Sequence, residues 1–273
     1  MTPLITTFKN KVWNSCIVKP KLLIRKKHKV LVDGVERTIS KQMQYLVQDI
    51  TKPFNTKFGR IPPKELKKKA GSAAKTEQGK DFTIIEADFL DQFKRLKKFA
   101  QTVTLKDIAH IVTETGINKD SVVVDAGAGS GALACYLGHI SKQVYTYEIR
   151  KESIDMSNHN ISALGLKNVT LREKDVTKGI SEKNVDVVTL DLPEPWNAIS
   201  SAHKALKIGG YIVSYSPTVP QVQKFVDSLG EKFLIIKTIE VIERPWVVEG
   251  QRVRPSNIDI GHTAFLTFAR KIK

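Results

Sequence analysis

Three closely spaced glycines follow a short apolar run that ends in an acidic residue. The segment reads Val122-Val-Val-Asp125-Ala-Gly127-Ala-Gly129-Ser-Gly131, and a helical pattern begins directly after it. Glycine lets the backbone approach a ligand closely, and the first turn of a helix offers unpaired N–H groups. The spacing is G-x-G-x-G, whereas pyrophosphate binding prefers G-x-G-x-x-G. The loop therefore favours a ligand that has a carboxylate and no phosphate.

Three further carboxylates follow predicted strands on the C-terminal side of this loop. Glu148 ends the second strand, where an acidic side chain can accept hydrogen bonds from both ribose hydroxyls. Asp175 follows the third strand, at the height of an adenine amino group. Asp191 ends the fourth strand and begins the sequence Asp-Leu-Pro-Glu-Pro-Trp, in which two prolines stiffen the loop. Because the carboxyl ends of parallel strands form one crevice, these groups predict a nucleotide-type site.

Each of these features also has a purely structural interpretation. The glycine loop alone is a weak signal, and Glu148 or Asp175 alone would more often be a solvated loop end. Asp191 alone could cap a helix. Trp196 either lines a target pocket or packs inward at the start of a helix, and the sequence leaves this open.

The elements that must position the site alternate regularly from Ser121 onward. Strand-like and helix-like runs follow one another, which predicts a doubly wound, Rossmann-like α/β sheet as a catalytic domain over residues 119–273. Its last two apolar runs have no convincing helix between them, so they predict an antiparallel edge pair. Residues 87–118 are expected to be a helical linker. It contains one amphipathic helix over residues 87–100 and a second that ends at Gly116.

Residues 1–86 predict a small β-rich domain. Apolar runs flank Asp33-Gly34, a strong hairpin signal, and more short β-type runs follow. Residues 1–100 hold 23 Lys and Arg against 9 Asp and Glu, whereas residues 101–273 hold 21 against 19. Such a distribution is typical of a nucleic-acid-docking module attached to a nearly neutral catalytic domain. The alternative is a merely soluble basic surface.

Cysteine, histidine and hydropathy patterns indicate what the chain lacks. Cys16 and Cys135 lie far apart and outside CxxC spacing, so neither a disulfide framework nor a zinc site is expected. The six histidines show no ligand spacing, and no metal is expected. No apolar run approaches the roughly 18 residues that a membrane span needs. The expected environment is a reducing cytoplasm, with no membrane partner.

Several motifs together resemble one enzyme family. The strings GAGSGAL, YEIR, DLPEPW, SYSPTVPQV, RVRP and GHTAFLTFARK are similar to those of the tRNA (adenine-N1)-methyltransferases that act on the T-loop, in particular the archaeal type. TKFGRI, GKDFTI and AQTVTLKD extend the resemblance into the N-terminal domain and linker. The resemblance implies S-adenosyl-L-methionine as cofactor and tRNA as partner. It also implies a homotetramer, methylation at T-loop position 58 and, as an open alternative, position 57 as well.

The resemblance also assigns roles to residues. Asp191 is expected between the cofactor and the target base as the catalytic residue. Glu148 is expected to hold the ribose, and Asp175 to lie beside the adenine. The other expected cofactor contacts are Gln101, Thr102, Val103, Gly127, Ala128, Gly129, Ser130, Gly131 and Ala132. Two positions depart from the family pattern: Thr104 stands where relatives usually have Tyr or His, and Ser153 where they often have Arg.

Basic residues suggest where RNA would dock. The runs Arg25–Lys29 and Lys67–Lys69 are candidates for contacts with the phosphate backbone. Arg252, Arg254 and His262 are expected to meet RNA phosphate or to pair with acidic neighbours. Two alternative functions remain: a methyltransferase of the same fold that acts on a protein or small molecule, and a non-catalytic RNA-binding subunit. The first leaves the basic N-terminal region unexplained, and the second expects a degraded glycine loop or the loss of Asp191.

Overall fold

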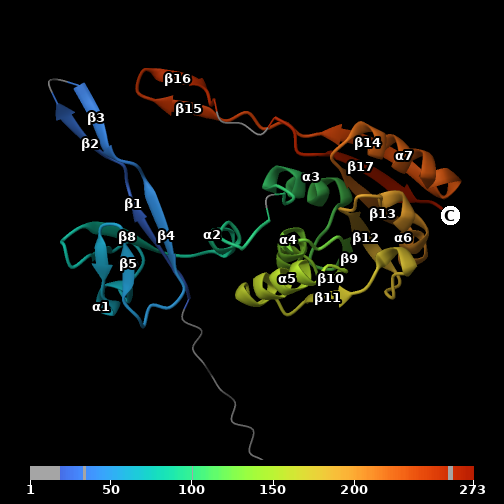
Figure 1. Cartoon of the computed structure of the whole chain (residues 1–273), viewed down its shortest axis with the longest axis horizontal. Helices are drawn as coiled ribbons and strands as arrows, with labels where there is room; N and C mark the ends of the chain where they lie inside the picture. The colour runs from blue at the N-terminus through green and yellow to red at the C-terminus, as the bar shows by residue number, and fades with distance from the viewer. Residues whose placement is uncertain (1–18, 33–34, 100, 258–260) are drawn as a thin grey trace, which may run out of the picture. The chain divides into compact units, whose positions relative to one another are not determined.

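The chain forms two compact units, Met1–Lys94 and Arg95–Lys273, in a computed structural model (Figure 1). The structure describes residues 19–32, 35–99, 101–257 and 261–273. Cys16 and the predicted turn at Asp33-Gly34 lie outside the described residues. Residues 95–118 of the predicted linker belong to the second unit.

The first unit is built on a four-stranded antiparallel sheet with the order β4-β1-β8-β7. Its strands are β1 (Lys21–Arg25), β4 (Met43–Val47), β7 (Ala73–Lys75) and β8 (Asp81–Glu86). Two hairpins and a short helix complete it: β2 (His28–Val32) with β3 (Val35–Ser40), β5 (Phe54–Thr56) with β6 (Gly59–Ile61), and α1 (Pro63–Leu66). A small apolar core holds the unit together, with Leu23, Val47, Ile61, Leu66, Phe82 and Ile84 among its members. The expectation of a β-rich N-terminal region is confirmed.

The connection between the units is less helical than the sequence pattern predicts. Helix α2 spans only Phe89–Phe93 and begins with a capping box between Asp88 and Asp91. The prediction of one helix over residues 87–100 is therefore wrong for residues 94–99. The backbone of Lys97 pairs instead with the Asn160 side chain, which accepts from its N–H at 3.2 Å and donates to its C=O at 2.7 Å. A tertiary contact has replaced the hydrogen bonds that a helix would form.

The second unit contains a seven-stranded sheet with the order β11-β10-β9-β12-β13-β17-β14. The strands are β9 (Val122–Ala126), β10 (Gln143–Glu148), β11 (Val169–Glu173), β12 (Val185–Leu190), β13 (Leu206–Ser216), β14 (Phe233–Glu240) and β17 (Phe265–Lys271). β9 to β13 are parallel, and β17 lies antiparallel to both β13 and β14. The doubly wound sheet and its antiparallel edge are thus confirmed. The hairpin of β15 (Trp246–Glu249) and β16 (Arg252–Pro255) was not predicted.

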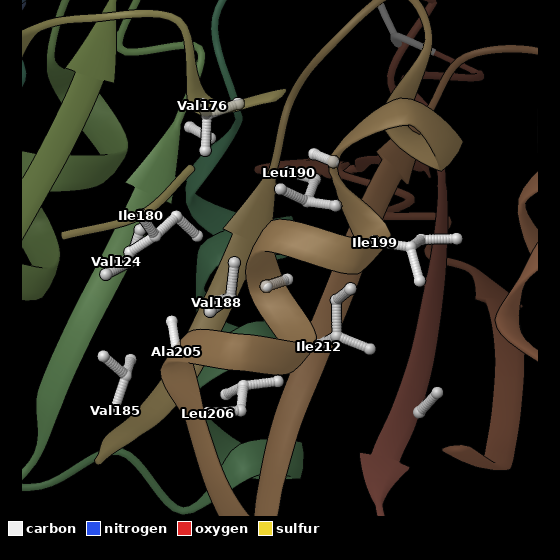
Figure 2. Close-up of a cluster of buried hydrophobic side chains, with 14 of the residues drawn as sticks. Val124, Val176, Ile180, Val185, Val188, Leu190, Ile199, Ala205, Leu206 and Ile212 are labelled. Carbon is white, nitrogen blue, oxygen red and sulfur yellow. The ribbon is translucent and has the colours of Figure 1, made fainter. Parts of the chain in front are cut away.

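Five α-helices of this unit alternate with the strands: α3 (Leu105–Thr115), α4 (Ala132–Ile140), α5 (Lys151–Ala163), α6 (Ile199–Ala205) and α7 (Val219–Leu229). Short 3-10 turns lie at η1 (Val176–Lys178), η2 (Pro195–Ala198) and η3 (Gly230–Lys232). Helix α3 ends at Gly116 in the left-handed conformation, with φ of 70°, as its pattern predicts. Figure 2 shows apolar side chains of β9, β12, β13 and α6 meeting in a buried cluster that includes Val124, Val188, Ile199 and Ile212. This packing fixes the strand ends that carry the candidate site.

Candidate cofactor and active site

The glycine loop joins β9 to α4 and has a backbone that only glycine adopts readily. Gly127, Gly129 and Gly131 have φ of 87°, 54° and 74°. A Cβ on Gly127 would lie 2.0 Å from the carbonyl oxygen of Asp191, so the two strand ends touch there. Gly131 is the N-cap of α4, and the first N–H groups of that helix are available to an anion. The loop can therefore receive a carboxylate.

Helix α5 holds the loop from behind with small polar side chains. Ser157 Oγ donates to the Gly129 carbonyl at 3.0 Å, and Asn160 Nδ2 donates to the Ser130 carbonyl at 2.8 Å. Ser153, at the position where the family resemblance suggests Arg, is buried, and its Oγ has no hydrogen-bond partner among the described residues. These residues lie three to four positions apart, so they share one face of the helix.

Glu148, at the end of β10, is a buried carboxylate with a full set of backbone donors. It is 5% exposed and accepts from the N–H groups of Gly129 at 3.0 Å, Ile149 at 2.9 Å and Arg150 at 3.0 Å. Burial alone would raise its pKa, but hydrogen bonds from Arg150, Gly129 and Ile149 outweigh it and lower the pKa. Oε1 takes two of the N–H groups and Oε2 only one, which leaves Oε2 room to accept a hydroxyl.

Two more aspartates stand at the ends of the adjacent strands β9 and β12. Asp125 is 1% exposed and accepts from Thr146 Oγ1 at 2.8 Å and Thr189 Oγ1 at 2.9 Å, one from each flanking strand. Burial raises its pKa to about 6. Burial, and then the charge of Asp125, raise the pKa of Asp191 to about 7, while the positive charge of Arg150 opposes the shift. This carboxylate forms no hydrogen bond within the described part of the chain, so it is a free acceptor.

Two hollows have Gly127 as a common lining residue. The first is lined by Gln101, Thr102, Val103, Asp125, Gly127, Ala128, Gly129, Ser130, Ala132, Leu133 and Asp191. The second is lined by Gly127, Tyr147, Glu148, Ile149, Lys174, Asp175, Val176, Thr177, Leu192, Pro193, Glu194 and Asn197. All the predicted site residues except Gly131 line one or the other. A Cβ on Gly131 would meet Ser157 at 3.1 Å, so this glycine packs against α5.

Sequence reasoning did not single out Asp125 as a site residue. Its only signal was its place as the acidic residue before the glycine loop. What makes it part of the site is the pair of threonine hydroxyls from β10 and β12, which the sequence cannot bring together. Asp175 lies in the second hollow, where its Oδ1 accepts from the N–H and Oγ1 of Thr177 at 2.9 and 2.7 Å. These hydrogen bonds lower its pKa, and Oδ2, which lies 4.0 Å from Lys178 Nζ, accepts none of them.

The loop after Asp191 is fastened to α7. Gln221 Nε2 donates to the Pro193 carbonyl at 2.9 Å, and Lys224 Nζ lies 4.1 Å from the centre of the Trp196 ring. Trp196 packs against the buried cluster of Figure 2 and lines neither hollow. The structure therefore supports the inward-packing interpretation of Trp196.

The C-terminal basic residues take different positions from one another. Arg252 and Arg254 lie on the β15–β16 hairpin and line neither hollow. The ring of His262 pairs with Glu240 and with the Pro217 carbonyl, and the Glu240 hydrogen bond raises its pKa. His262 thus follows the second expectation, pairing with an acidic neighbour. Among the described residues, no cluster of three or more His, Cys, Asp or Glu could hold a metal ion, and no helix could cross a membrane.

The sheet order, the glycine loop on an α-helix N-terminus and the carboxylate at the end of the second strand define a class of enzyme. They are the features of an S-adenosylmethionine-dependent methyltransferase. Within that class, residues 94–261 match the model of the family described as tRNA methyltransferase complex GCD14 subunit, and the chain belongs to this family.

Individual relatives agree with this placement. The chain is 35% identical to the tRNA (adenine(57)-N(1)/adenine(58)-N(1))-methyltransferase TrmI of Methanocaldococcus jannaschii, over 89% of this chain and 94% of the relative. A crystal structure of a SAM-dependent O-methyltransferase from Thermotoga maritima superposes with a TM-score of 0.78 at 30% identity, covering 93% of each chain. The tRNA (m1A58) methyltransferase TrmI from Aquifex aeolicus has the same fold, with a TM-score of 0.74, 24% identity, and 93% and 97% coverage.

Proposed function

We propose that the chain transfers a methyl group from S-adenosyl-L-methionine to N1 of an adenine in the T-loop of tRNA, at position 58. The adjacent position 57 is a second candidate, because the M. jannaschii relative is named for both. One observation of the site carries the proposal. Asp191 presents a partly buried carboxylate without a hydrogen-bond partner among the described residues, next to a loop shaped for this cofactor.

The chain's own residues fit the cofactor. Gly127 permits a close approach that any Cβ would block, and Glu148 Oε2, which accepts one N–H group, can also accept a ribose hydroxyl. Residues 101–103 and 127–132 would hold the methionine part of the cofactor in the first hollow. Glu148 and Asp175 would hold the adenosine part in the second hollow. When bound, the cofactor supplies an electrophilic methyl group on a sulfonium.

Asp191 would act on the target base. N1 lies on the Watson–Crick edge, so the adenine must leave its stack and enter the pocket. Methylation of N1 places positive charge on the ring, and the N6 amino group beside it becomes a stronger donor. The Asp191 carboxylate would accept from N6 and stabilise that charge. Its low-dielectric surroundings strengthen the interaction.

The basic unit Met1–Lys94 would dock the tRNA backbone. Lys64, Lys67 and Lys69 are exposed on and beside α1. Arg25 is less available, because its guanidinium stacks on Phe58 at 4.5 Å and donates to the Asp81 carbonyl. Arg25 would therefore contribute little to the docking of tRNA by the run Arg25–Lys29.

The edge of the large sheet supports self-association. On the edge strand β14, Leu234, Ile235 and Ile236 are 52%, 43% and 45% exposed in succession. A contiguous exposed apolar stretch on an edge strand is a candidate contact surface for another chain. We infer that this strand contributes to a homotetramer. We also infer that the enzyme works in the cytoplasm. The family description names a complex subunit, so a different partner chain is the competing outcome.

Incubation of the purified chain with labelled cofactor and unmodified tRNA, followed by mapping of the modified nucleoside, tests the proposal. The expected product is 1-methyladenosine at position 58 or at both positions. Transfer to protein or to a small molecule only would favour the first alternative function. Methylation that requires an added partner subunit, while Asp191→Ala has no effect, would favour the non-catalytic one.

A further inference from the structure

Lys106 and Asp107, at the start of α3, form an ion pair inside the second unit. Asp107 is fully buried, the Lys106 side chain is 10% exposed, and Lys106 Nζ lies 3.0 Å from Asp107 Oδ1. The same ammonium donates to the Val241 carbonyl and to Thr263 Oγ1, both at 2.7 Å. All three of its hydrogens therefore have an acceptor.

The other oxygen of Asp107 accepts from three hydroxyl groups, one three residues earlier in the chain and two from distant segments. Oδ2 accepts from Thr104 Oγ1 and Thr263 Oγ1 at 2.8 Å each, and from Tyr215 Oη at 3.2 Å. Thr104 directly follows residues 101–103, which line the first hollow. Tyr215 is the penultimate residue of β13, the strand next to β12 and Asp191. The Asp107 carboxylate thus links Thr104, next to the residues that line the first hollow, to the end of β13.

The buried Lys106–Asp107 network adds little net stability to the fold. Burying two charges costs free energy that their attraction recovers only with complete hydrogen bonding, and an apolar pair of similar size is often as stable. Complete pairing, however, fixes geometry closely. Thr104 stands where the family resemblance suggests an aromatic residue, and its hydroxyl is directed to Asp107. The Tyr215 hydroxyl lies 3.2 Å from Asp107 Oδ2, and burial, followed by the charge of Asp107, raises the pKa of Tyr215.

We propose that Lys106 and Asp107 are positioning residues for methyl transfer. Through Thr104 they fix the wall of residues 101–103 for cofactor binding, and through Tyr215 they fix the end of β13 for the transfer step. The second half rests on the proposed function, whereas the first concerns cofactor binding alone.

Three single variants and one double variant separate the effect on cofactor binding from the effect on transfer. The readouts are calorimetric affinity for S-adenosylmethionine, turnover on tRNA and melting temperature. Thr104→Val should weaken cofactor affinity about tenfold and leave kcat at saturating cofactor unchanged. Tyr215→Phe should leave cofactor affinity unchanged and lower kcat about tenfold. Asp107→Asn should do both, and adding Thr104→Val to it should weaken the affinity no further.

Asn168→Ala is the matched control. Asn168 donates to the carbonyls of Gly138 and Ser141, away from both hollows, so its loss should lower the melting temperature without changing affinity or kcat. If Thr104→Val and Tyr215→Phe behave like this control, the network is only structural and the proposal is overturned. If the wild-type chain binds the cofactor but does not methylate tRNA, the proposed function fails. The affinity of the Thr104→Val variant for S-adenosylmethionine then still decides whether the network positions residues 101–103 for cofactor binding.

Discussion

The two units of the chain place their charged side chains in different surroundings. Arg95–Lys273 gathers Asp125, Glu148 and Asp191 at the ends of three adjacent strands, where burial raises the pKa of the two aspartates and hydrogen bonds lower that of Glu148. Met1–Lys94 places lysines such as Lys67 and Lys69 on the surface, where water and salt surround them. The first arrangement gives each group an individual chemical role. The second gives many groups one collective role.

This difference determines how each unit should respond to change. A buried carboxylate acts through short, unscreened interactions, so one substitution should have a large effect that salt hardly alters. Exposed lysines act through a screened field, so each should contribute little and the total should depend on ionic strength.

Asp191→Ala should lower kcat on tRNA by about 100-fold or more, because the charge that develops on the adenine loses its fixed acceptor. Steady-state methylation assays at saturating cofactor would measure the loss. Asp227→Ala, which removes an exposed carboxylate on α7, is the control and should retain full activity. Turnover near the wild-type value in Asp191→Ala would refute the assigned role.

Gly127→Ala should abolish detectable cofactor binding in calorimetry. Its methyl group would lie 2.0 Å from the Asp191 carbonyl oxygen, so the loop must move. Gly165→Ala provides the control, because Gly165 also has a positive φ, of 64°, but has no atom within 4 Å of an added Cβ. Both variants bear the left-handed strain of about 1 kcal/mol, and only the first has the collision. Equal cofactor affinity in the two variants would contradict this geometry.

Replacing Lys67 and Lys69 together with Ala should weaken tRNA binding up to about tenfold near physiological salt and reduce the slope of log affinity against log salt by about one to two. Titrations at several salt concentrations would give the slope. The control pair is Lys119 and Lys142, exposed in the second unit and outside both hollows. An equal reduction in both pairs would mean that docking is not confined to the first unit.

Cofactor affinity should rise a few-fold between pH 6 and pH 8. Without ligand, the pKa of Asp191 is about 7, so near pH 6 most of this carboxyl group is protonated. A sulfonium cation favours the ionised form, so binding should release a proton below about pH 7 and be tighter above it. Calorimetry in buffers of different ionisation enthalpy measures this release. S-adenosylhomocysteine, which lacks the charge, should show a smaller pH dependence, and an identical dependence for both ligands would contradict the assignment.

Much of the fold and site could be predicted from local sequence alone. The alternation of apolar strands and amphipathic helices defines the doubly wound sheet, because these periods reflect local burial. Glu148, Asp175 and Asp191 were found because each directly follows a predicted strand, and parallel strands end at the same edge of a sheet. Gly116 was found because a left-handed helix end favours glycine.

Only tertiary structure decided the features that depend on residues far apart in the chain. Asn160 ends the helical pattern at Phe93 by pairing with Lys97, which lies 63 residues away. Asp125 becomes part of the site because Thr146 and Thr189 come from the strands on either side of it. Trp196 packs inward because α7 fastens its loop.

The sequence by itself therefore determined which residues carry chemistry, because the requirements of a glycine loop or a strand end are local. The folded chain decided how those residues are held and charged. The carboxylates of the site become neighbours only when separate strands pack side by side, and the Lys106–Asp107 network forms only when segments more than 100 residues apart come into contact.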